Sequence, residues 1–116
     1  MQHITYADKS ILMGDAAAKT ALEYAAELAH SGDADDVQFR AISSDGDNVE
    51  AILLLGGGSP IMAESAHTQL PEPDNTAALE YMKGRLDALR HVPVAGALDP
   101  DEFGAGGYFE YEITGG

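Results

Sequence analysis

The stretch VQFRAISSDGDNVEAILLL, residues 37–55, decides the predicted fold because it reads as two strands joined by a tight turn. Residues 37–42 alternate between apolar and polar side chains, as a strand buried on one face does. Asp45-Gly46 is a strong hairpin signal, because glycine adopts the positive φ that such turns need. Residues 49–55 form the return strand. Its second half, residues 52–55, is apolar on both faces, which predicts a central position in the sheet.

The residues before this stretch predict a first hairpin followed by a helix. Residues 3–6 and 10–13 are short strand-like segments separated by a turn. A helix is predicted from 15 to 31, with Asp15 as its N-cap. Its apolar stripe is mostly alanine, so the helix is expected to approach the sheet closely; the stripe consists of Ala18, Ala21, Leu22, Ala25, Leu28 and Ala29. An acidic loop is predicted at 33–36.

The residues after the stretch predict one more strand and a second helix. Residues 61–65 favour a strand over the alternative, a helix that begins at Ser59-Pro60. A helix is predicted from 76 to 91, capped by Asp74 or Asn75. Its apolar stripe consists of Leu79, Met82, Leu86 and Leu89.

This order of elements predicts an α+β two-layer sandwich, in which a mainly antiparallel sheet of four to five strands carries two helices on one face. We predict that residues 1–94 form a single domain and that residues 95–116 form a Gly/Asp-rich, flexible C-terminal tail. An edge strand is predicted at 108–113 of that tail, which would place Phe109, Tyr111 and Ile113 on one face.

Composition limits the function. The 116 residues include 20 acids, 6 bases and no cysteine, with a net charge of −14. Nucleic-acid binding is excluded, because affinity for phosphates comes mainly from Lys and Arg. Docking on an anionic membrane is disfavoured for the same reason, and no apolar stretch approaches the roughly 20 residues of a spanning helix. We expect a soluble cytoplasmic protein whose acids chiefly maintain solubility.

Few residues suggest chemistry. The Gly56-Gly57-Gly58-Ser59 turn is the main candidate for binding a small molecule, since glycine-rich turns can hold a phosphate. However, the turn has no lysine, and a plain connection in which glycine adopts positive φ is the favoured interpretation. The four histidines show no metal-ligand spacing, and no serine lies in a nucleophile motif. We therefore predict no catalytic residue, no metal and no cofactor.

The chain ends in Gly115-Gly116, and its opening order is hairpin, helix, strand. In these two features it resembles ubiquitin-like modifiers and sulfur carriers of the β-grasp class. The resemblance implies that the carboxylate of Gly116 is activated as an adenylate by an E1-like enzyme, with residues 108–114 as the last strand. Residues 60–107, including the second helix, have no counterpart in that class.

The favoured hypothesis is a non-enzymatic protein that binds another protein or forms a homodimer, with Phe109, Tyr111 and Ile113 pairing at an exposed sheet edge. Three alternatives stay open: the activated modifier, an inhibitor that mimics the charge of DNA, and a small-molecule binder at the Gly56–Ser59 turn.

Overall fold

The computed structural model describes residues 1–58 and 60–91 of the chain. The elements are β1 (Gln2–Tyr6), β2 (Lys9–Met13), α1 (Asp15–Ser31), β3 (Ala34–Ile42), β4 (Asn48–Gly56), β5 (Ile61–Ser65) and α2 (Thr76–Arg90). This order confirms the predicted sequence of elements, including the strand at 61–65. The predicted tail at 95–116 lies outside the described residues.

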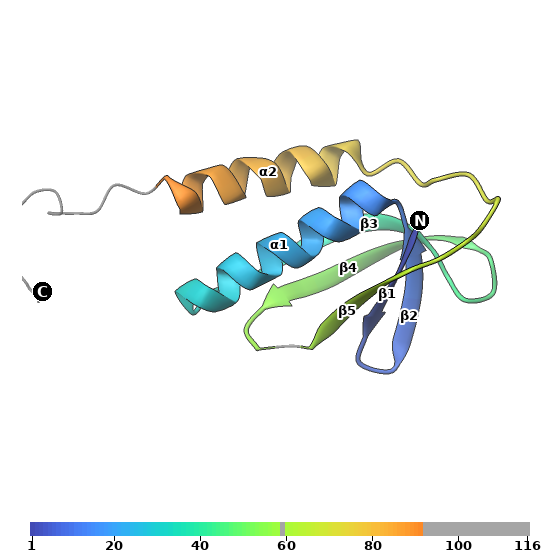
Figure 1. Ribbon diagram of the computed structural model, residues 1–116, viewed down its shortest axis with the longest axis horizontal. Helices are drawn as coiled ribbons and strands as arrows, with labels where there is room; N and C mark the ends of the chain where they lie inside the picture. The colour runs from blue at the N-terminus through green and yellow to red at the C-terminus, as the bar shows by residue number, and fades with distance from the viewer. Residues whose placement is uncertain (59, 92–116) are drawn as a thin grey trace, which may run out of the picture.

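The five strands form one antiparallel sheet in the order β4-β3-β2-β1-β5, and both helices lie on the same side of it (Figure 1). The predicted α+β class is thus confirmed. The hairpin β3–β4 is long and regular, with pairs running from Ala34 and Gly56 to Ile42 and Asn48. In contrast, β2 meets β3 only at the pair Leu12 and Ile42. Beyond that pair the two halves of the sheet diverge.

The short connection between β4 and β5 brings the two edges of the sheet together at one end (Figure 1). Gly56, Gly57 and Gly58 all have positive φ, at 82°, 65° and 82°. Residues with a Cβ rarely adopt this conformation, so the glycines explain how so few residues reverse the chain. A hydrogen bond of 2.9 Å from the Tyr6 hydroxyl on β1 to the carbonyl of Leu54 on β4 also joins the two halves.

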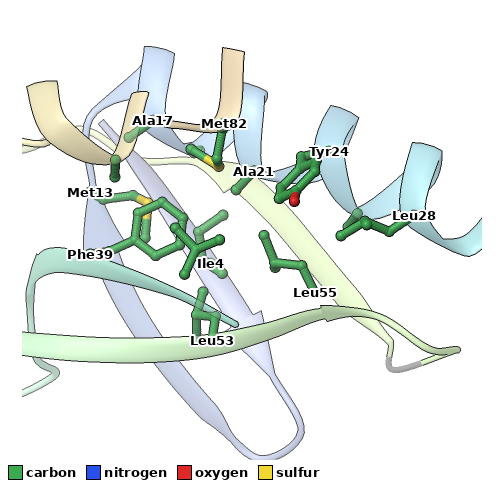
Figure 2. Close-up of a cluster of buried hydrophobic side chains, with 14 of the residues drawn as sticks. Ile4, Met13, Ala17, Ala21, Tyr24, Leu28, Phe39, Leu53, Leu55 and Met82 are labelled. Carbon is green, nitrogen blue, oxygen red and sulfur yellow. The ribbon is translucent and has the colours of Figure 1, made fainter. Parts of the chain in front are cut away.

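Small side chains on α1 allow it to pack closely against the sheet. The core contains large residues from the strands and from both helices, grouped around the alanines of α1 (Figure 2): Ile4, Met13, Phe39, Leu53, Leu55, Tyr24, Leu28 and Met82. Two faces of α1 are covered, since Ala17, Thr20 and Tyr24 are buried in addition to the predicted stripe. The reason is that α2 packs beside α1, which the sequence pattern did not reveal. Ala29, predicted in the stripe, is exposed.

Two predicted termini were wrong in detail. Asp15 is the first residue of α1 and not its N-cap, which is Gly14. The Asp15 carboxylate instead lies 2.9 Å from the N-terminal amine, and this hydrogen bond lowers the pKa of Asp15. The acidic residues 35 and 36 lie in β3 and not in a loop, because the strand begins at Ala34, three residues earlier than predicted.

The predicted central position of residues 52–55 was also wrong. β4 is the last strand of the sheet, and the side chains of Ile52 and Leu54 are 65% and 49% exposed. Leu53 and Leu55 are buried against the helices, as their alternation requires. The strand therefore has one apolar side packed in the core and a second apolar side that faces outward.

Candidate functional site

The outer edge of β4 carries backbone groups that no strand in residues 1–58 and 60–91 pairs with, and the contacts of Asn75 show which way these groups point. The amide N–H of Arg40 on β3 donates to Asn75 Oδ1 at 2.7 Å, and Asn75 Nδ2 donates to the Arg40 carbonyl at 2.8 Å. Both polar groups of Arg40 therefore point away from β4. In an antiparallel pair, the residue opposite must then point its own groups away too. That residue is Glu50.

Because the pattern repeats every two residues, the N–H and C=O groups of Asn48, Ile52 and Leu54 point the same way as those of Glu50. The hydrogen bond from Tyr6 to the Leu54 carbonyl agrees with this direction. Among the described residues, no strand pairs with β4 on that side, where the Tyr6 hydroxyl of β1 binds the Leu54 carbonyl. The edge from 48 to 52 is consequently an open template for hydrogen bonding by another extended segment.

An apolar pair lies on the open face directly beside this edge. Ile52 and Leu54 point away from the helices, with Gln38 and Asp36 opposite them on β3. Gln38 Nε2 donates to Glu50 at 2.9 Å, so the polar neighbours bind one another and leave the apolar pair uncovered. Ile52 and Leu54 are themselves among the residues whose backbone groups point out of this edge, and this arrangement distinguishes them from isolated exposed apolar residues, which are common.

A hollow of about 320 Å³ adjoins the first half of β4. Its polar lining includes the acids Glu50 and Asp74 and the base Arg40. The hydroxyl and amide of Thr76 lower the pKa of Asp74, which keeps that carboxylate charged. With two acids and one base the hollow has a net negative charge, so it suits a cationic side chain.

A carboxylate on the helix side of the sheet holds the two helices in place. The side chain of Asp35 at the start of β3 accepts hydrogen bonds from the hydroxyls of Tyr24 on α1 and Tyr81 on α2, the latter at 2.5 Å. The two rings meet edge to face with their centroids 6.4 Å apart. These contacts fix α2 along the part of β3 that β2 does not reach.

The pKa values of this cluster follow from its contacts. Burial alone would raise the pKa of Asp35, but the hydroxyls of Tyr24 and Tyr81, together with the charge of Arg85, bring it below its ordinary value. Burial and the Asp35 carboxylate raise the pKa of Tyr24, and the hydrogen bond to Asp35 raises that of Tyr81. The cluster keeps a charged acid and neutral phenols at neutral pH, which is the state of a structural contact.

The structure places the predicted small-molecule turn at the connection between β4 and β5. Gly56, Gly57 and Gly58 have the positive φ of the favoured interpretation, while Ser59 lies outside the described residues. The element that follows is the strand β5, so the turn does not lead into the helix N-terminus that phosphate binding uses. Ligand binding at this turn stays a prediction.

The other predicted site residues lie beyond the described part of the chain. Phe109, Tyr111 and Ile113, predicted to pair at an edge, and Gly115-Gly116, predicted for the modifier alternative, all belong to residues 92–116. Within the described part, histidines and acids form no group of three or more that could hold a metal ion.

Sequence reasoning missed the residues that define this site. Asp74 or Asn75 was predicted to cap α2, and Asn75 does occupy the N-cap position, but its side chain binds a strand 35 residues away and not the N–H groups of the helix. Asp74 supplies the local contact to Thr76 instead. No local sequence pattern predicts a contact between residues so far apart. For β4, the apolar alternation of residues 52 and 54 was visible in the sequence, but it was assigned to burial by neighbouring strands.

Comparisons of the chain with protein-family models, curated proteins and solved structures find no match. Neither of the helices in residues 1–58 and 60–91 is long and apolar enough to cross a membrane.

Proposed function

We propose that this protein is a non-catalytic binding module that receives an extended segment of another polypeptide along the outer edge of β4. The observation that carries the proposal is the pair Ile52 and Leu54, exposed on the same strand whose N–H and C=O groups at 48, 50 and 52 point away from the sheet. A bound segment would add a sixth strand through main-chain hydrogen bonds.

Side chains of the partner would supply the specificity. A segment paired with β4 places alternate residues on the open face, where they would cover Ile52 and Leu54. We therefore expect apolar side chains at positions i and i+2 of the partner. Covering two half-exposed aliphatic side chains is the main source of apolar contact at this edge.

The charge of the surroundings favours a basic partner. Asp36 and Glu50 flank the apolar pair, and Asp74 adds a carboxylate to the hollow beside the strand. The net charge of −14 attracts a cationic segment over longer distances and raises its rate of association. The same charge opposes pairing between two copies of the chain, so a different polypeptide is the proposed partner.

Fluorescence anisotropy with a labelled nine-residue peptide of alternating lysine and valine tests the proposal. The wild-type chain should bind this probe, and binding should weaken as salt is added, because the attraction between exposed charges is screened. A peptide of alternating glutamate and valine is the charge control and should bind far more weakly. Equal binding of both peptides would contradict the charge argument.

A pair of substitutions at one position tests the backbone argument. Glu50→Pro removes an N–H that points out of the sheet, so it leaves the β3–β4 hydrogen bonds intact and should abolish peptide binding. Glu50→Gln is the matched control, since it removes the charge but keeps the N–H, and it should retain most of the binding. If Glu50→Pro melts like the wild type and still binds the peptide normally, strand addition at β4 is wrong.

A further inference from the structure

We propose that residues 108–113 of this same chain dock antiparallel on the edge of β4 and compete with the outside partner. This inference rests on the proposed function, because it assigns an internal occupant to the same edge. Its consequence is regulation, because the segment would lower the apparent affinity of the site for the partner.

The chain leaves α2 close to the end of β4, so the segment that leads to residues 108–113 starts near the edge on which they are proposed to dock. Arg90, the last residue of α2, lies with its Nε 3.5 Å from Glu27 Oε2 on α1. The next residue of α1, Leu28, lies against Gly56 at the end of β4, where an added Cβ would come within 2.7 Å of the Leu28 Cβ. The ends of α2 and β4 therefore flank the same turn of α1, as Figure 1 also shows.

The length of the intervening chain suffices. Sixteen residues, 92–107, separate the end of α2 from Tyr108. Such a segment spans about 50 Å when extended and roughly 20–24 Å on average as a flexible chain. A tether of this length gives an effective concentration on the order of millimolar, which favours docking within one chain over docking between copies.

The pattern of residues 108–113 fits the exposed face. Antiparallel entry from the Gly56 end places the side chain of Phe109 beside Leu54 and that of Tyr111 beside Ile52, with period-two alternation on both strands. Because Tyr6 already binds the Leu54 carbonyl, the main-chain hydrogen bonds of docking would form at Ile52 and Glu50. Large aromatic side chains would then cover the two exposed aliphatic ones. Glu110 and Glu112 would alternate to the opposite face.

The charges of the two parts of the chain predict how salt affects this docking. Residues 92–116 contain five acids and no base, and residues 1–91 also have a net negative charge. Repulsion between them weakens as salt screens it, so docking of residues 108–113 should strengthen with added salt. Binding of a basic partner should respond in the opposite direction.

Paramagnetic relaxation enhancement on the full chain tests the inference directly. The chain contains no cysteine, so Thr114→Cys provides a single position for a spin label. We expect broadening of the amide signals along β4, strongest near Asn48 and Glu50, and more broadening as salt is raised. Antiparallel docking predicts this gradient, whereas broadening strongest near Gly56 would contradict the proposed direction. The label is placed beyond the proposed contact residues.

A mixture of isotope-labelled chain without the spin label and unlabelled chain with it separates docking within one chain from docking between copies. Broadening in that mixture would show that a second copy supplies the segment and would overturn the proposal. So would the absence of broadening in the singly labelled chain.

The full-length triple variant Phe109→Ser, Tyr111→Ser and Ile113→Ser tests whether the segment competes with the peptide for the β4 edge. If the segment occupies the edge in half of the molecules, this variant should bind the lysine–valine peptide about twice as tightly as the wild type. Unchanged affinity would refute the competition while leaving the proposed function standing. No peptide binding by either chain would instead refute the proposed function.

Discussion

Asn75 takes the place beside Arg40 that a neighbouring strand would take elsewhere in the sheet. Its side-chain amide accepts from the N–H of Arg40 and donates to the carbonyl of the same residue, at 2.7 and 2.8 Å. The contact lies where β2 has already diverged from β3, and it joins the start of α2 to the sheet. Through the pairing of Arg40 with Glu50, it also shows which way the outer groups of β4 point.

Replacing Asn75 should therefore destabilise the whole domain. Asn75→Ala leaves a part-buried N–H and C=O on β3 without partners, which should cost about 2 kcal/mol of unfolding free energy. Denaturation by urea, followed by circular dichroism, measures the loss. Asn48→Ala, at an exposed asparagine on β4, is the control and should change stability little. Equal effects of the two substitutions would contradict the role of the Asn75 amide.

The Asp35 cluster should make stability depend on pH in a defined direction. Because the pKa of Asp35 is lowered in the folded state, its stabilisation is present above the ordinary value of 3.8 and is lost as the pH falls through the lower folded value. Asp35→Asn should thus be less stable than the wild type at neutral pH, and the difference should shrink below about pH 4. Asp36→Asn is the matched control, because Asp36 is the next residue of β3 and its side chain lies on the open face of the sheet. A difference that grows on acidification would refute this assignment.

Alanine should be tolerated less well at Gly56, the last residue of β4, than at Gly58 two residues later, although the two backbones have the same φ. Gly56 and Gly58 share a φ of 82°, so alanine at either position costs about 1–2 kcal/mol in backbone strain. At Gly56, however, an added Cβ would lie 2.6 Å from the Asp33 carbonyl, whereas nothing lies within 4 Å at Gly58. Gly56→Ala should therefore lower the melting temperature clearly more than Gly58→Ala. Equal shifts would mean that close packing at Gly56 contributes nothing.

Substitution of an alanine of α1 by a larger residue should destabilise the domain on the buried side of the helix and be tolerated on the exposed side. Ala21 is fully buried between the sheet and α2, so Ala21→Leu should destabilise the domain by about 1–3 kcal/mol through overpacking. Ala26→Leu changes an exposed position of the same helix and should have little effect. Thermal unfolding compares the two variants. A tolerated leucine at Ala21 would show that the helix does not need small residues there.

The elements of this fold could be predicted because their signals are local. The alternation of residues 37–42, the Asp45-Gly46 turn and the alanine stripe of residues 15–31 each lie within one element or one turn. The position of β4 could not be predicted in the same way. Apolar residues at 52–55 fit a central strand as well as an edge strand with an exposed apolar face, and the sequence pattern is identical in both cases.

The contacts that assemble the elements were missed for a related reason. Asp35 meets Tyr81 across 46 residues, and Asn75 meets Arg40 across 35. No periodicity or spacing rule connects such pairs, because they depend on how far β2 diverges from β3. The candidate site could not be predicted for the same reason, because the Asn75 contact is what shows that the backbone groups of Glu50 point out of the sheet.

Amide hydrogen exchange along β4, measured by NMR on the full chain with and without the lysine–valine peptide, tests the central claim most directly. Addition of saturating peptide should slow exchange at Glu50 and Ile52, whose N–H groups point outward, and leave the already paired Ala51 and Leu53 unchanged. Peptide that binds without slowing exchange at Glu50 and Ile52 would contradict strand addition at this edge.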